Sequence, residues 1–379
     1  MTAVSKSADW SPLARTLTRR SFLGWSLATT AGLGAANMFL VAPKRDRVAL
    51  TWMPSRGTLA SVDDYPIWVA FERGYLKQLG VDLSIVAQRE PSPGGAGADS
   101  AVTFVSPAEL LSMADRGLNP TSIFQLCAGS VFGFALHRGG RVRRPRDLEG
   151  ASIAIGDESW KAIVDPLLVE AGVNPRVVTL VVARDRWLEF AADGVTDAAL
   201  SWRGLAHTDA GRHLTHFVGD RWSQLPAHSY AVVGLEHRTA LEIDGLNRFL
   251  QALVLALEFA AENPRGAAQI TYRSAPGLAE TLSPQAAVDS LAVASSVYSS
   301  GRRRGMAWGL HERPRWQRYM SAAEQSGLAK PASKPVYSNQ LIATANSIDT
   351  TLVHLDAATF ALDRDFRHTT GLTGGIVDG

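Results

Sequence analysis

The sequence predicts an α/β protein with two lobes, each built around its own sheet. Its 379 residues exceed one typical domain. A strand-helix-strand pattern occurs twice, over 47–127 and over 151–201, and the chain after residue 235 is mainly helical. Hydrophobic residues make up 46% of the chain and charged residues 20%, so most of it can fold around apolar cores. Strands that alternate with helices favour parallel sheets, whose ligands bind at the carboxyl ends of the strands.

The first part of the chain alternates strands and helix starts. A helix is predicted after the first strand, because Ile67, Ala70 and Phe71 have helical spacing. The run Ser106-Pro107-Ala108-Glu109 opens another helix, since serine caps, proline starts and an acidic residue stabilises a first turn. The predicted strands are 47–53, 82–87, 101–105, 121–127 and 131–137.

The rest of the chain continues the alternation and then becomes helical. One helix ends at Gly172, and Pro166 either kinks it or marks its start with Asp165 as the cap. The clearest amphipathic helix surrounds 246–257. The predicted strands are 152–155, 177–182, 197–201 and 228–234, and further helices begin at Asn263-Pro264 and Ser283-Pro284 and cover 314–326 and 338–346.

The net charge of +2 comes from the N-terminus. The first 36 residues carry four of the 38 basic residues and one of the 36 acidic ones, so the rest of the chain holds 34 and 35. That near-neutral remainder has no overall electrostatic reason to bind nucleic acid or an anionic membrane. The arginine-rich loop 138–146 is predicted to be a solvated turn.

Residues 1–42 are predicted to be an export signal. Thr18-Arg19-Arg20-Ser21-Phe22-Leu23 resembles the twin-arginine (Tat) motif of bacteria, and no charged residue occurs from Ser21 to Ala42. We therefore expect the Tat machinery to export the protein to the periplasm or the cell surface. The signal is then either cleaved or retained as an N-terminal anchor.

Motifs of catalysis and cofactor binding are absent from the sequence. It has no Walker loop, dinucleotide-binding turn, zinc-protease motif or nucleophile elbow, so no cofactor, metal ion or catalytic residue is predicted. The one cysteine, Cys127, lies in an apolar run and excludes an intrachain disulfide. His207, His213 and His216 form only a loose cluster. Of the ten tryptophans, several fall near strand ends or helix starts, where rings line ligand clefts or close helix-sheet cores.

A family resemblance starts at Asp64-Tyr65-Pro66-Ile67-Trp68-Val69-Ala70-Phe71-Glu72-Arg73-Gly74-Tyr75-Leu76 and continues through 79–83, 105–109, 146–150, 195–199 and 263–268. Over about 47–346 the chain resembles ABC-transporter substrate-binding proteins of the nitrate/sulfonate/taurine and thiamine-pyrimidine-precursor group. The resemblance implies a periplasmic-binding-protein type II fold, with two α/β lobes joined by two hinge crossings near 135–140 and 232–236. Lobe one would comprise 44–136 and 236–346, lobe two 137–235, and a C-terminal extension 347–379.

Within that fold, the ligand shell is expected at strand ends and helix starts. The expected residues are Trp52, Tyr65, Trp68, Ser106, Ser130 and Phe132 in lobe one, Asp157, Glu158, Ser159 and Trp202 in lobe two, and His228 or Tyr230 on the returning strand. Backbone N–H groups at helix starts favour an anion. Asp157 and Glu158 instead suit a cationic or neutral N-heterocyclic ligand stacked on tryptophan. Alternatively, both carboxylates only complement the helix dipole from outside the site.

Two functional hypotheses follow from the resemblance. The favoured one is a monomeric receptor that delivers a small organic molecule to an ABC permease, with an N-heterocycle or amine favoured over sulfonate or nitrate. The alternative is an enzyme on the same scaffold, since desulfinase and pyrimidine-synthase proteins resemble this fold. A desulfinase needs a cysteine nucleophile near the first helix, whereas Cys127 lies in an apolar strand.

Overall fold

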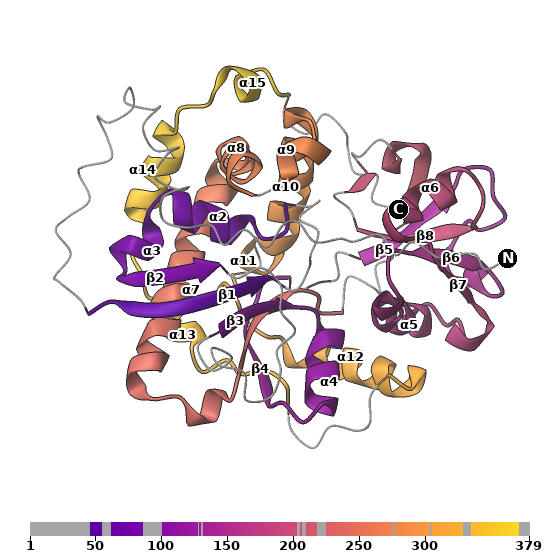
Figure 1. Cartoon of the computed structure of the whole chain (residues 1–379), viewed down its shortest axis with the longest axis horizontal. Helices are drawn as coiled ribbons and strands as arrows, with labels where there is room; N and C mark the ends of the chain where they lie inside the picture. Colours follow the sequence, from indigo (N-terminus) through magenta and orange to yellow (C-terminus); the bar gives the residue numbers. More distant parts are fainter. Residues whose placement is uncertain are drawn as a thin grey trace, which may run out of the picture. The chain divides into compact units, whose positions relative to one another are not determined.

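The computed structural model describes residues 46–54, 62–85, 101–127, 129, 132–202, 205–206, 210–217, 225–275, 277–303, 305–328 and 335–370 (Figure 1). The predicted export signal, 1–42, and the end of the predicted C-terminal extension lie outside these residues. The described residues fold around two five-stranded sheets. No helix among them is long and apolar enough to cross a bilayer.

The first sheet combines four early strands with one that returns later, in the order β2-β1-β3-β10-β4. Its strands are Val48–Pro54 (β1), Val81–Ile85 (β2), Ala101–Val105 (β3), Pro120–Gln125 (β4) and Ser229–Val233 (β10). β1 runs parallel to β2 and β3, as the alternation predicts, whereas β10 runs antiparallel to β3 and β4. The sheet is therefore mixed, with β10 antiparallel to both of its neighbours.

The second sheet has the order β7-β6-β8-β5-β9. Its strands are Phe132–His137 (β5), Ser152–Ile155 (β6), Thr179–Val182 (β7), Ala198–Trp202 (β8) and Leu214–Phe217 (β9). β6 runs parallel to β7 and β8, and β5 runs antiparallel to β8 and β9. β9 has no counterpart among the predicted strands, because four residues are too short to show a period.

The chain passes from the first sheet to the second between β4 and β5, and it returns between β9 and β10. The sequence places these crossings near 135–140 and 232–236. In the structure β5 already belongs to the second sheet and β10 to the first, so the two passages are 126–131 and 218–228. An apolar strand pattern indicates burial but does not indicate which sheet the strand joins.

Helices cover both faces of the first sheet (Figure 1). On one face lie α2 (Tyr65–Glu72) and α7 (Ala240–Glu262), with α8 (Pro264–Ser274) and α10 (Pro284–Tyr298) packed against them. On the other lie α4 (Pro107–Asp115) and α12 (Arg313–Ser326), which share an apolar cluster with Val105 and Ala231. The late helices therefore pack on the first sheet, as predicted. The shorter helices are α3 (Tyr75–Gln78), α9 (Leu278–Thr281), α11 (Ser300–Arg303), α13 (Ile342–Ala345), α14 (Thr351–Thr359) and α15 (Arg364–Arg367).

Three predicted helix caps form, at Ser106, Asn263 and Ser283. Ser106 caps α4, since its Oγ accepts from the Glu109 N–H (3.3 Å) while the Glu109 carboxylate accepts from the Ser106 N–H (2.6 Å). Asn263 and Ser283 cap α8 and α10 in the same manner through their side-chain oxygens. Each such cap is worth about 1 kcal/mol, so the cap fixes Ser106 at the exit of β3.

Two helices accompany the second sheet. α6 (Trp187–Ala192) packs on β5, β6 and β8, and α5 (Lys161–Glu170) lies on the opposite side in Figure 1. α5 begins at Lys161, so Pro166 lies inside the helix and does not start it. Asp165 is therefore not a cap. Its carboxylate accepts instead from the Lys161 ammonium group (2.7 Å).

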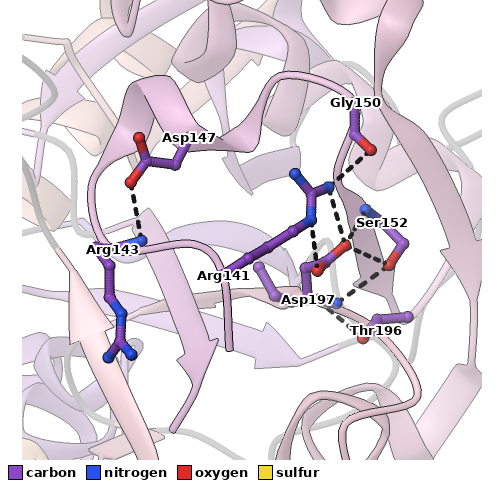
Figure 2. A network of polar contacts seen from close by, with 8 residues as sticks. Arg141, Arg143, Asp147, Gly150, Ser152, Thr196 and Asp197 are labelled. Carbon is purple, nitrogen blue, oxygen red and sulfur yellow. Dashed lines mark hydrogen bonds and ion pairs between the residues drawn. The ribbon is translucent and has the colours of Figure 1, made fainter. Parts of the chain in front are cut away.

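Asp197 anchors the basic loop to the second sheet (Figure 2). Its carboxylate accepts from Arg141 Nε (3.1 Å) and from both the N–H and the hydroxyl of Ser152 (2.8 and 2.9 Å). Arg141 also donates to the Gly150 carbonyl (2.8 Å). Burial raises the pKa of Asp197, but the hydrogen bonds from Ser152 and Arg141 outweigh it and hold the pKa below its ordinary value. The loop 138–146 is largely exposed, as predicted, and Arg141 fixes its position.

Hydrogen bonds hold residues 336–338, which precede α13, against β4. Ser122 exchanges two backbone hydrogen bonds with 336–338, at 2.9 Å each. Its hydroxyl lies 2.6 Å from His311 Nε2, and His311 Nδ1 lies 2.8 Å from Asn339 Oδ1. The helix predicted over 338–346 is consequently reduced to α13, because Ser338 bonds to β4 and Asn339 bonds to His311 instead.

α14, in the predicted C-terminal extension, is fastened to α2 and α3. Asp356 accepts from the Arg73 guanidinium (Nε at 3.0 Å) and from the Tyr75 hydroxyl (2.6 Å). The guanidinium also lies over the rings of Phe259 and Phe360, at 5.9 and 5.3 Å from their centroids. The weak signals after residue 346 do not predict this helix.

Gln125, the last residue of β4, joins both passages to α12. Its Nε2 donates to the carbonyls of Cys127 (2.8 Å) and His228 (3.0 Å). Its Oε1 accepts from the Trp316 indole (2.9 Å), and its backbone N–H donates to the Gly309 carbonyl (2.8 Å). One buried glutamine therefore joins β4 to four other segments, three through its side-chain amide and one through its backbone N–H.

Candidate ligand-binding site

Two of the predicted tryptophans meet on the first sheet. Trp52 lies on β1 and Trp68 on α2, and their rings pack edge to face with centroids 6.0 Å apart. Both are buried. An indole N–H can only donate, yet neither Nε1 has a hydrogen-bond partner in the described part of the chain. Both rings belong to the apolar core of the first sheet, and neither lines the pocket described below.

Three buried tyrosines lie around the start of α2. The rings of Tyr65 and Tyr298 stack with centroids 5.5 Å apart, and the Tyr298 hydroxyl donates to the Asp63 carbonyl (2.8 Å). The Tyr230 hydroxyl has no hydrogen-bond partner among the described residues. Burial raises the pKa of all three above the ordinary value of 10, and the Asp64 carboxylate raises that of Tyr230 further. The three side chains are therefore neutral near pH 7. No sequence signal near Tyr298 indicates this position, because α10 comes from a distant part of the chain.

Ser106 and Phe132 line a pocket beside the two passages. α5 contacts both α4 and α12 here, and the cavity beside them has a volume of about 20 Å³, room for about one water molecule. Figure 1 shows the three helices close together at this place. The walls consist of 106–108 at the start of α4, Phe132 of β5, Ile163, Pro166 and Leu167 of α5, 225–227 of the return passage, and Tyr319 of α12.

The predicted carboxylates do not line this pocket. Asp157, Glu158 and Ser159 are exposed in the turn before α5. Asp157 caps the short 3-10 turn Glu158–Trp160, since its Oδ1 accepts from the Ser159 N–H (2.9 Å). Hydrogen bonds from Ser159 hold the pKa of Asp157 below its ordinary value. Asp157 therefore acts here as a cap, the second of the two interpretations that the sequence allows.

Three predicted aromatic residues gather at the passages. Trp202, at the end of β8, is buried and pairs with Phe132 across the second sheet. The His228 ring packs on Phe104 (4.8 Å between centroids) and on Phe132 (5.2 Å). Ser130 lies outside the described residues. The predicted site thus divides into an aromatic group at the passages and the tryptophan-tyrosine group of the first sheet.

Cys127 is fully buried where the first passage begins. Its N–H donates to the His228 carbonyl (3.0 Å), and its own carbonyl accepts from the Ala227 N–H (3.2 Å). A buried thiol in such a setting is not accessible to a solute. Within the described ranges, no group of three His, Cys, Asp or Glu residues could hold a metal ion, and His207 lies outside those ranges.

Tyr319 is a pocket residue that sequence analysis missed. Its ring lies one helical turn after Trp316, with centroids 6.4 Å apart. The side chain is buried, and its hydroxyl has no hydrogen-bond partner in the described part of the chain. Burial raises the pKa of Tyr319, and the Glu109 carboxylate raises it further. The available signal was an aromatic pair at i and i+3, which indicates a shared helix face but not a pocket.

Solved structures of other proteins share this arrangement. A putative periplasmic sulfonate-binding protein SsuA of an ABC transporter from Methylobacillus flagellatus KT has a TM-score of 0.56 at 13% identity, over 79% of this chain and 94% of that chain. The alkanesulfonate-binding protein SsuA from Xanthomonas axonopodis pv. citri, bound to MOPS, has a TM-score of 0.54 at 11% identity, over 79% and 98%. The desulfurization enzyme DSZB has a TM-score of 0.50 at 14% identity, over 79% and 99%. No curated protein matches the sequence.

At these identities the solved structures establish the fold alone, which is the two-sheet fold of periplasmic binding proteins. The family is established by the sequence itself. A family model described as NMT1/THI5 like matches residues 62–267, more than half of the chain. This match covers the second sheet, both passages and every pocket residue except Tyr319. The chain therefore belongs to the NMT1/THI5-like family.

Proposed function

We propose that this protein is an extracytoplasmic solute-binding receptor that delivers a small organic molecule to the permease of an ABC importer. The family and the fold that it shares with sulfonate-binding components of ABC transporters support this proposal. The observation that carries it is the pocket beside the passages. One wall comes from α4 on the first sheet and another from α5 on the second, so a solute bound there contacts both parts.

The indole N–H groups of Trp52 and Trp68 provide evidence on the chemical class of the ligand. Trp52 and Trp68 each offer an indole N–H that nothing in the described residues accepts. A nitrogen heterocycle supplies acceptors for such groups and stacks on aromatic rings. A sulfonate or nitrate also supplies acceptors, but among the described residues no cationic side chain lines the separate pocket beside the passages to balance its charge. We therefore favour a heterocyclic solute.

Binding without turnover is the property to measure. A thermal-shift screen of pyrimidines, amines, sulfonates, nitrate and aromatic acids should reveal one class that stabilises the protein and is recovered unchanged. Trp68→Phe keeps a ring but removes the donor, so it should weaken binding about tenfold, the value of one hydrogen bond. Trp187→Phe is the control, because the Trp187 indole already donates to the Leu200 carbonyl (3.0 Å) in the second sheet. If no solute stabilises the protein, it is not a receptor of this kind.

Export by the Tat machinery is the second part of the proposal. It rests on Arg19-Arg20 in the N-terminal segment, which lies outside the described residues. Replacing both by lysine should leave the protein in the cytoplasm, whereas the same replacement at Arg15 should not. Secretion of the double variant at the normal rate would contradict Tat export.

The enzyme alternative has one observation in its favour, the likeness to DSZB, of which a cysteine-to-serine variant is known in complex with biphenyl-2-sulfinic acid. In the present chain the sole cysteine, Cys127, is fully buried. Incubation with biphenyl-2-sulfinic acid separates the two functions. Release of sulfite that disappears in Cys127→Ala would establish an enzyme, and an unchanged sulfinate supports the receptor.

A further inference from the structure

We propose that β7 is an interface between two copies of this protein, which associate by antiparallel pairing of β7 with the β7 strand of the second copy. The inference does not depend on the proposed receptor function, and it replaces the monomer that the sequence leads us to expect. It follows from the position of β7 in its sheet, from the backbone groups that face outward, and from the side chains that β7 exposes.

β7 is an edge strand of the second sheet. It pairs with β6 on one side, and no strand among the described residues pairs with it on the other side (Figure 1). An edge strand presents N–H and C=O groups with which a further strand can pair. Two other sheet edges are protected from such pairing. Residues 336–338 bond to β4, and β2 carries the charged side chain of Asp82, which pairs with Arg47 (2.9 Å).

Two residues of β7 direct their backbone groups away from β6. The N–H groups of Thr179 and Ala183 donate to carbonyls at either end of β6, at 2.9 and 2.8 Å. Successive residues of a strand direct their backbone groups to opposite sides. The odd-numbered residues therefore face β6, and Leu180 and Val182 face outward.

The residues on either side do not extend this outward row. The Val178 N–H already donates to the Pro175 carbonyl (3.3 Å) in the turn before β7. Arg184 has a φ of +50°, a left-handed conformation that ends the extended backbone. A partner strand therefore finds the outward groups of Leu180 and Val182 alone.

A two-fold axis at Val181 uses both of these residues. Opposite residues in an antiparallel pair either both exchange hydrogen bonds or both face away from each other. With the axis at Val181, Leu180 of each copy lies opposite Val182 of the other, and each of these two pairs exchanges two hydrogen bonds. An axis at Leu180 would instead place Val182 opposite Val178, whose N–H is already engaged.

The side chains of β7 suit a second copy of the same strand. Residues 177–183 contain no charged residue, so no like charges lie opposite each other along them. Val177 and Val182 are 45% and 44% exposed, and pairing sets Val182 against the apolar side chain of Leu180. None of these residues lines the pocket beside the passages, so association leaves that pocket uncovered.

Sedimentation of the full-length protein over a range of concentrations measures the association. We expect a monomer-dimer equilibrium. Val182→Lys should raise its dissociation constant about tenfold or more, because the axis brings the two ammonium-bearing side chains to diagonal positions roughly 7–8 Å apart. Val195→Lys is the matched control, since it adds the same charge at a valine that is 62% exposed and lies outside β7. Every variant contains the N-terminal segment, so association through that segment would not respond to Val182→Lys.

A second pair of variants tests the register. The axis brings the two Val181 Cα atoms to about 4.5 Å, so Val181→Cys should form a disulfide-linked dimer on mild oxidation. Thr179→Cys is the control, because its two sulfurs would lie four residues apart along the strands, roughly 14 Å. The native cysteine, Cys127, is fully buried and does not interfere. A monomer at every concentration, an unchanged dissociation constant in Val182→Lys, or equal cross-linking of the two cysteine variants would overturn the inference.

Discussion

Acid should weaken the folded protein through one buried histidine. His311 is 3% exposed and lies between the Ser122 hydroxyl and the Asn339 amide, at 2.6 and 2.8 Å. An amide oxygen only accepts, so Nδ1 donates to Asn339, and Nε2 is left to accept from Ser122. Both bonds suit a neutral ring. Burial lowers the pKa of His311 from 6.5 to about 4, although the hydrogen bond to Asn339 opposes the change.

The size of the effect follows from these two pKa values. Between pH 6.5 and 4 the unfolded chain binds a proton at His311 that the folded chain does not bind. The free energy of unfolding therefore falls as the pH falls through this range, and His311 contributes no further loss below it. The whole loss amounts to about 3 kcal/mol, most of which has occurred by pH 4.5.

Urea unfolding at pH 7.5 and pH 4.5 measures this loss in the wild type and in His311→Gln. Glutamine does not titrate, so the variant should lose about 2 to 3 kcal/mol less than the wild type between the two pH values. All other carboxyl and imidazole groups titrate in both proteins, and the comparison removes their share. His354→Gln, with a side chain 47% exposed, serves as the control and should lose as much as the wild type. Equal losses in wild type and His311→Gln would refute the reasoning.

Two further substitutions test packing on the first sheet by thermal or urea unfolding. Asp356→Asn should cost about 2 kcal/mol, because Arg73 loses a charge-assisted partner; no change would mean that the pair adds nothing to stability. Gly309→Ala should cost about 3 kcal/mol or more, because φ is +80° and the new Cβ would lie 2.3 Å from the Phe124 ring. Gly305→Ala, with φ of +79° and open space around it, should cost only the backbone part of about 1 kcal/mol. Equal costs at the two glycines would show that the Phe124 ring yields freely.

The sequence predicts where elements begin better than it predicts how they assemble. Ser106 with Glu109 forms the expected capping box, because a cap depends on side chains only three residues apart. Assignment of β5 and β10 to their sheets depends on pairing with strands far away in the chain. The apolar residues of β5 and β10 do not indicate which strand each one pairs with. Both predicted crossings therefore differ from the observed ones by several residues.

The same distinction explains the result at the site. Trp52 and Trp68 were predicted because a strand end and a helix start are local features, and they do meet. Asp157 follows a strand end as well, but its side chain turns back on its own helix start, which a one-dimensional pattern does not reveal. Tyr319 reaches the pocket only because α12 packs on α5, so no local signal could have assigned it there.

The amide of Gln125 has a mechanical consequence for the proposed receptor. Through Trp316 it couples α12 to the first sheet, whereas Ile163 travels with the second sheet on α5. Tyr319 and Ile163 therefore lie on two parts that only the two passages connect covalently, although α12 and α5 contact each other. A solute that touches both adds its binding free energy solely to arrangements in which α5 and α12 meet. Such a solute links α5 to α12 reversibly. Its binding free energy adds to the free energy needed to separate the two parts.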